Sequence, residues 1–182
     1  CLVGSEMCIR DRSNMARYDY NLVAVGAGAA GLVSSYIASA VKARVALIEK
    51  NLMGGDCLNY GCVPSKSLIS SAKLVHQLNQ HERFGLKEIQ YQVDFPLVME
   101  RIQEIIEAIT PHDSVERYTS LGVECIEGNA KLVSPHELEV NGSLLSTKNI
   151  VIATGASPAI PPIPGLEDSA YSLSLIHISE PT

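Results

Sequence analysis

The two cysteines best placed to do chemistry stand in a glycine-rich stretch, residues 54–66, which reads G-G-D-C-L-N-Y-G-C-V-P-S-K. Cys57 and Cys62 are close enough to form a disulfide, and the glycines around them let the backbone bend to close it. Pro64 opens a run with helical spacing, where its missing N–H costs nothing. Cys62 is therefore expected just ahead of a helix N-terminus, where the dipole stabilises a thiolate. A thiolate is the form that attacks disulfides and binds soft metals.

A second motif lies nearer the beginning of the chain. Residues 18–25 are predicted to form a short buried strand, 26–31 read G-A-G-A-A-G, 32–41 continue as a small apolar helix, and 45–48 form a second strand closed by Glu49. A G-x-G-x-x-G between strand and helix, with an acid ending the next strand, is typical of a dinucleotide-binding unit. A close-packed glycine turn without a ligand is the alternative.

Each part of this motif has an expected role. Gly26 makes the tight turn, Gly28 lets a pyrophosphate approach the backbone, and Gly31 lets the helix pack on the strand. The helix N-terminus faces the phosphates, because its N–H groups have no partners within the helix. Glu49 is expected to accept hydrogen bonds from an adenosine ribose.

The chain resembles the class I pyridine nucleotide–disulfide oxidoreductases in the cysteine motif, its spacing and the trailing P-S-K. The cysteine motif starts a few residues after Glu49, as in the FAD domain of that family rather than its nicotinamide domain. The resemblance implies an α/β fold: a Rossmann-like FAD-binding domain with a parallel sheet and a small antiparallel β crossover, truncated before the nicotinamide and dimerisation domains.

The resemblance also implies a path for electrons from NAD(P)H to FAD, then to the disulfide, then to substrate. Cys62 would lie next to the flavin ring as the charge-transfer thiolate, and Cys57 would be the exposed thiol that attacks the substrate. Lys66 would place its ammonium near the flavin N5, where negative charge develops on reduction. A solvated lysine is the alternative for Lys66.

Further contacts with FAD are implied along the chain. A G-x-A at Gly128 and Ala130 would lie by the adenine, and the A-T-G of 153–155 by the flavin dinucleotide. The full set of expected cofactor-binding residues is Gly26, Gly28, Ala30, Gly31, Glu49, Lys50, Gly55, Asp56, Cys57, Lys66, Gly128, Ala130, Ala153, Thr154 and Gly155.

One position departs from the family pattern, because Asp56 stands where threonine is usual. A carboxylate there would sit near the FAD phosphates, which is unfavourable unless helix N–H groups satisfy it. The motif looks most like the mercuric-reductase-like branch, with a disulfide or metal ion as substrate. A dihydrolipoyl dehydrogenase is the alternative.

The remaining elements follow from periodicity and turn residues. Residues 64–80 and 95–121 are expected to be helices, the second kinked by Pro111, with its apolar stripe in the core. Short strands are expected at 123–127, 130–134, 137–140 and 143–146, in the region that forms the antiparallel crossover in the family. A further buried strand is expected at 149–153, where the chain returns to the parallel sheet.

Composition limits the partners. The 182 residues carry a net charge of −6 without a basic cluster, so we expect no nucleic acid, and no apolar run is long enough to span a bilayer. Hydrophobic residues make up 46% and Trp is absent, so the core must be aliphatic. A close cysteine pair in a cytoplasmic chain favours catalysis or metal binding over a structural disulfide. The family resemblance implies a homodimer when the protein is complete.

The two ends of the chain look foreign to it. Residues 5–12 and 173–182 resemble translations of a sequencing adaptor, so segments 1–13 and 173–182 are expected to be adaptor-derived tails around a partial FAD-binding domain at 14–172. Frayed native termini are the alternative.

Two hypotheses of other classes remain open. In the first, Cys57 and Cys62 hold Zn²⁺ or Hg²⁺ in a metal-binding module, although a structural zinc site needs four ligands and the sequence has no second cysteine pair. In the second, the chain is a nucleotide-binding domain without catalysis, whose cysteines are never reduced.

Overall fold

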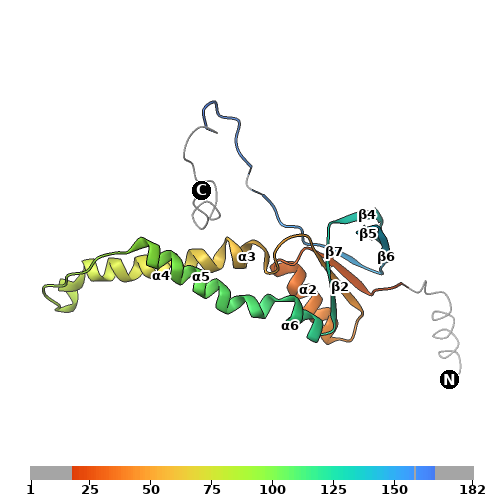
Figure 1. Cartoon of the computed structure of the whole chain (residues 1–182), viewed down its shortest axis with the longest axis horizontal. Helices are drawn as coiled ribbons and strands as arrows, with labels where there is room; N and C mark the ends of the chain where they lie inside the picture. Colours follow the sequence, from red (N-terminus) through yellow and green to blue (C-terminus); the bar gives the residue numbers. More distant parts are fainter. Residues whose placement is uncertain (1–17, 158, 167–182) are drawn as a thin grey trace, which may run out of the picture.

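A computed structural model describes residues 18–157 and 159–166 of the chain (Figure 1). The tails expected at 1–13 and 173–182 lie outside the described residues, as do residues 14–17 and 167–172 next to them.

A four-stranded parallel sheet forms the centre of the molecule, in the order β3-β2-β1-β7. Its strands are β1 (Leu22–Val25), β2 (Val45–Glu49), β3 (Val123–Glu127) and β7 (Ile150–Ile152). Leu22 pairs with Val45, and Val23 pairs with Ile150, so β1 lies between β2 and β7. The chain leaves β1 towards β2 and later returns to the opposite side of β1, which creates a topological switch point between β1 and β7.

Helices cover one face of this sheet. The helix α2 (Ala29–Ala40) connects β1 to β2, and the short helix α6 (Val115–Ser120) leads into β3. The core between helices and sheet is aliphatic apart from one tyrosine: Ala24, Ala27, Leu32, Val45, Leu47, Tyr118 and Val123. This composition agrees with the expectation of an aliphatic core for a parallel sheet.

A three-stranded antiparallel sheet covers the opposite face (Figure 1). It contains β4 (Ala130–Ser134), β5 (Glu137–Val140) and β6 (Ser143–Ser146). The second core lies between the two sheets and includes Val23, Ala46, Ile48, Leu138 and Val140. The molecule is therefore built of three layers, and the expected Rossmann-like fold with an antiparallel crossover is confirmed.

Grouping 123–127 with the antiparallel crossover was wrong. This segment is β3, the edge strand of the parallel sheet, with Val123 paired to Val45 and Glu127 to Glu49. The segment is parallel to β2 because helices precede it, and a strand–helix–strand crossover brings the chain back in the same direction.

The helical hairpin formed by α4 (Cys62–Asn79) and α5 (Phe95–Ile109) projects away from the sheets (Figure 1). The expected interruption near Pro111 is confirmed by the 3₁₀ segment η2 (Thr110–Asp113), which separates α5 from α6. A second 3₁₀ segment, η1 (His81–Phe84), follows α4.

Two burial predictions were wrong. The apolar stripe of 95–121 is not a continuous core, because only Ile102 of α5 is buried while Leu97 is 59% exposed. The strand at 149–153 is shorter than expected, and Ile152 at its end is 65% exposed. Both follow from what covers these elements: α4 and α5 pack chiefly on each other, and β7 is an edge strand of the described sheet.

No helix within the described ranges combines the length and the apolar character needed to cross a membrane.

Candidate functional site

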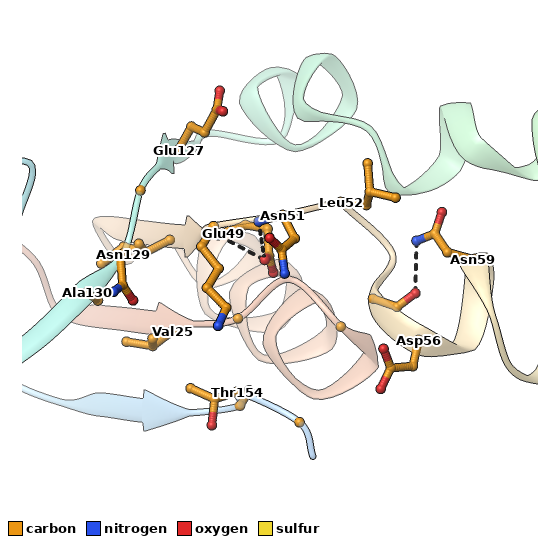
Figure 2. A pocket seen from close by; sticks show the side chains of 18 of the residues that line it. Val25, Glu49, Asn51, Leu52, Asp56, Asn59, Glu127, Asn129, Ala130 and Thr154 are labelled. Carbon is orange, nitrogen blue, oxygen red and sulfur yellow. Dashed lines mark hydrogen bonds between the residues drawn. The ribbon is translucent and has the colours of Figure 1, made fainter. Parts of the chain in front are cut away.

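A hollow opens at the carboxyl ends of the parallel strands, beside the segments that follow β1 and β7 (Figure 2). Its volume of about 680 Å³ lies within the range of about 300–1,000 Å³ typical of ligand pockets. Crevices at the switch point of a parallel sheet are the usual ligand sites of such folds. The walls come from the strand ends, the glycine turn, α3 (Gly55–Asn59) and the link from β3 to β4.

The glycine turn after β1 brings three backbone segments into contact. Gly26 has φ +104°, and a Cβ there would lie 2.2 Å from the Ala153 carbonyl oxygen. A Cβ on Gly31 would lie 1.8 Å from the Gly26 carbonyl oxygen. Neither position accepts a side chain without moving backbone, so the tight turn expected at Gly26 is present and Gly31 packs against that turn.

Gly28 is different, because protein packing leaves room for a side chain there. A Cβ on Gly28 would meet only the Gly55 Cα, at an ordinary 3.9 Å, and the backbone is extended at φ −78° and ψ −175°. Gly28 is also the N-cap of α2, and no side chain caps this helix. The first-turn N–H groups of α2 and the space above Gly28 thus remain open towards the cavity.

Glu49 ties the end of β2 to the glycine turn. Its Oε2 accepts a hydrogen bond from the Ala27 N–H at 2.5 Å, and its Oε1 accepts from the Lys50 and Asn51 N–H groups at 2.9 and 2.8 Å (Figure 2). A carboxylate has about four acceptor positions, so some capacity remains for a ligand hydroxyl. The acid is therefore both an anchor of the loop and a candidate ligand contact.

The wall that carries α3 is held against the glycine turn. The Gly54 N–H donates to the Ala27 carbonyl at 3.0 Å, and a Cβ on Gly55 would lie 2.7 Å from the Gly28 Cα. The Asn59 amide donates to the Gly55 carbonyl at 2.9 Å within α3 (Figure 2). It also donates to the Met53 carbonyl at 3.1 Å. These contacts fix the backbone from which the first cysteine projects.

The cysteines stand at the junction of α3 and α4. Cys57 lies within α3 and is partly buried, whereas Cys62 is exposed and is the first residue of α4, not a residue ahead of it. Both are free thiols in this structure. A hydrogen bond with the Cys62 thiol, followed by burial, raises the pKa of Cys57, while the Cys62 backbone N–H and the Lys66 ammonium oppose that rise.

The observed exposures of the two thiols differ from those expected. Cys57 was expected to be the exposed thiol, yet it is the more buried of the two because α3 lies beneath the start of α4. The first N–H of α4 acts on Cys57 and lowers its pKa, so the N-terminus of this helix influences the first cysteine of the pair.

Most of the expected cofactor-binding residues line the cavity. They are Gly26, Gly28, Glu49, Lys50, Gly55, Asp56, Gly128, Ala130, Ala153, Thr154 and Gly155. Four others do not: Ala30 is exposed and Gly31 is buried in the first turn of α2, Cys57 lies within α3, and Lys66 lies in α4.

Several lining residues were not predicted: Val25, Ile48, Asn51, Leu52, Asn59, Tyr60, Glu127 and Asn129. Val25, Ile48 and Glu127 are at or near the ends of parallel strands, a position that a strand-end rule would have found. The amide of Asn59 carries no such signal, because its role depends on the folded path of α3.

Outside the cavity, the described part of the chain holds no group of three or more His, Cys, Asp or Glu side chains arranged to bind a metal ion.

Comparison with known proteins decides the family. A model of the pyridine nucleotide-disulphide oxidoreductases matches residues 20–179. The chain belongs to this family. It is 33% identical over 178 residues to a mercuric reductase of Bacillus cereus, covering 97% of this chain and 28% of that protein. It is 34% identical to a dihydrolipoyl dehydrogenase of Acholeplasma laidlawii, covering 87% and 47% of the two chains.

A solved oxidoreductase of this family has the same fold. The Cu(II) complex of the HOCl-induced flavoprotein disulfide reductase RclA from Escherichia coli superimposes with a TM-score of 0.63 at 29% identity, covering 81% of this chain and 31% of that one. The present chain thus spans less than half the length of these curated relatives and about a third of that structure.

Proposed function

We propose that the full-length protein is an FAD-dependent NAD(P)H oxidoreductase with a redox-active Cys57–Cys62 disulfide. The observation that carries the proposal is the position of the cysteine pair beside the switch-point cavity. Cys57 follows directly on the two α3 residues that line the cavity, Gly55 and Asp56, and Cys62 begins the next helix, α4. Family membership supports the same class of reaction.

The cavity fits a dinucleotide. Uncapped N–H groups of α2 and the open space at Gly28 suit a pyrophosphate, and Glu49 retains acceptor capacity for ribose hydroxyls. Gly128 and Ala130 would hold the adenine, and Ala153, Thr154 and Gly155 would lie along the rest of the dinucleotide. When bound, FAD accepts a hydride from NAD(P)H and passes electrons on singly or in pairs.

The chain's own residues would then carry out thiol–disulfide exchange. Reduction of the Cys57–Cys62 disulfide takes up two electrons and two protons and yields two thiols. Attack of one thiolate on a substrate disulfide forms a mixed disulfide and expels the first substrate thiol. Attack of the second cysteine on the mixed disulfide releases the second substrate thiol and re-forms the Cys57–Cys62 disulfide. The net reaction consumes NAD(P)H, one proton and the substrate disulfide. It yields NAD(P)⁺ and two thiols.

The substrate class we propose is a disulfide or a metal ion, as in a mercuric-reductase-like enzyme, since thiolates bind soft metals. A dihydrolipoyl dehydrogenase is the second candidate, because the relative of that name is as similar to the chain as the mercuric reductase. In both cases the nicotinamide-binding segment would come from sequence beyond this chain.

The proposal includes a homodimer in the cytoplasm. Apolar side chains on the outer faces of α4 and α5, such as Ile69, Leu74 and Leu97, are more than half exposed and suit a protein contact. A working dithiol requires a reducing compartment.

Steady-state kinetics of the full-length protein test the proposal. NAD(P)H oxidation is followed with Hg²⁺, with lipoamide and with a small aromatic disulfide, in the parent and in Cys57→Ser and Cys62→Ser. We expect turnover with one substrate and its loss in both variants, while NAD(P)H still reduces the bound flavin. Unchanged turnover in Cys57→Ser would favour a domain whose cysteines play no redox part.

A further inference from the structure

Asp56 places a free negative charge where the proposed dinucleotide would carry its own charges. It is the second residue of α3, it is exposed to the cavity, and its carboxylate accepts no hydrogen bond from any described residue. Its Oδ2 lies 3.9 Å from the position that a Cβ on Gly155 would occupy, so it points across the cavity towards the loop after β7 (Figure 2). Glu49, in contrast, is held by three backbone N–H groups.

The beginning of α2 is the part of the cavity best suited to phosphate groups, and Asp56 adjoins it. Gly55, the neighbour of Asp56, touches Gly28 at the N-cap of α2, and α2 has neither a capping side chain nor an acid in its first turn. The carboxylate of Asp56 therefore lies in the same cavity as Gly28, the N-cap at the positive end of α2. The negative charge of Asp56 would reduce the positive electrostatic potential that the N-terminus of α2 offers to a bound pyrophosphate.

Nearby positive charge does not cancel the effect. The charged side chains of the lining are Glu49, Lys50, Asp56 and Glu127, which sum to a net negative charge. Lys50, directly after Glu49 at the end of β2, is the single basic side chain among the lining residues.

We propose that Asp56 is an affinity-determining residue of the dinucleotide site: its carboxylate opposes the pyrophosphate, so this protein binds FAD less tightly than it would with a neutral residue at position 56. The inference rests on the proposed function. We expect the removal of one like charge from the same cavity to change binding of a phosphate-bearing ligand by about tenfold, the equivalent of about 1.4 kcal/mol. The effect belongs to phosphate-bearing ligands and is absent for neutral ones.

The test measures dissociation constants of the full-length protein, prepared without flavin, for FAD by fluorescence quenching and for ADP and adenosine by calorimetry. Asp56→Asn keeps the shape and removes the charge. We expect it to tighten FAD and ADP by about tenfold and to leave adenosine unchanged, with the difference narrowing at about 1 M salt, where charges are screened. Glu104→Gln, which removes an exposed carboxylate on α5 outside the cavity, is the control and should leave ADP binding unchanged.

Equal or weaker ADP binding in Asp56→Asn overturns the inference while the proposed function stands, because FAD still binds. An equal gain for adenosine also overturns it, because the effect would not follow the phosphates. If neither FAD nor ADP binds to the parent or to the variants, the proposed function fails and the inference fails with it.

Discussion

Two glycines of the G-x-G-x-x-G motif, Gly28 and Gly31, should respond in different ways to substitution by alanine. A methyl group on Gly31 would start 1.8 Å from the Gly26 carbonyl oxygen, and both groups belong to the backbone. A methyl group on Gly28 would meet only the Gly55 Cα at 3.9 Å and would project into the cavity. Gly31→Ala should therefore damage the fold, and Gly28→Ala should damage ligand binding.

The magnitudes follow from the geometry. Overpacking costs about 1–3 kcal/mol, and so severe a contact belongs at the upper end, while alanine in a helix gains about 1 kcal/mol over glycine. Gly31→Ala should therefore lose about 2 kcal/mol of unfolding free energy. At Gly28 the backbone suits alanine, so a weaker N-cap and a less flexible unfolded chain nearly cancel, within about 0.5 kcal/mol.

Urea unfolding of the chain, followed by circular dichroism without FAD, measures the first effect. With a slope of about 2 kcal/mol/M, Gly31→Ala should lower the midpoint by about 1 M and Gly28→Ala should leave it almost unchanged. FAD fluorescence measures the second effect, and Gly28→Ala should weaken binding by at least about tenfold, since uncapped helix N–H groups bind phosphate only at short range. Equal midpoints for both variants, or unchanged FAD affinity in Gly28→Ala, would refute the reasoning.

Three further predictions concern other groups. Glu49→Gln should lower the unfolding free energy by about 1–2 kcal/mol and weaken ADP binding, because an amide replaces a carboxylate that accepts three backbone hydrogen bonds. Urea unfolding measures the stability and calorimetry measures the binding. An unchanged unfolding free energy would contradict this prediction. Burial, and then the hydrogen bond to Glu124, raises the pKa of Tyr20 to about 12, so ultraviolet titration should show a late tyrosine step that is lost in Tyr20→Phe. Because the folded-state pKa is raised, this contribution to stability is present below about pH 10 and is lost as the pH rises towards 12. Iodoacetamide should modify the exposed Cys62 before Cys57, because the pKa of Cys57 is raised. Cys62→Ala should speed the modification of Cys57, since it removes the thiol that raises this pKa. Peptide mass spectrometry would show the order, and earlier modification of Cys57 would contradict the prediction.

The local parts of the site were predictable because their signals are local. The turn at Gly26, the acid that ends β2 and the cysteine pair are each encoded within a few neighbouring residues. Their meeting at one end of a parallel sheet then follows from connectivity alone.

The errors arose where the outcome depended on distant partners. Periodicity showed that 95–109 is a helix with an apolar stripe, but it could not show that the described chain leaves Leu97 uncovered. The strand 123–127 looked like its antiparallel neighbours, and only its pairing with β2 separates it from them. The bond from Ala27 to Glu49 joins residues whose contact exists only after folding.

Anaerobic reductive titration of the full-length flavoprotein tests the central claim, that Cys57 and Cys62 form a redox pair served by the flavin. The flavin and the disulfide each accept two electrons, so the parent should take up twice as many electrons per flavin as Cys57→Ser before the flavin absorbance is fully bleached. Equal uptake by the parent and by Cys57→Ser would contradict the account.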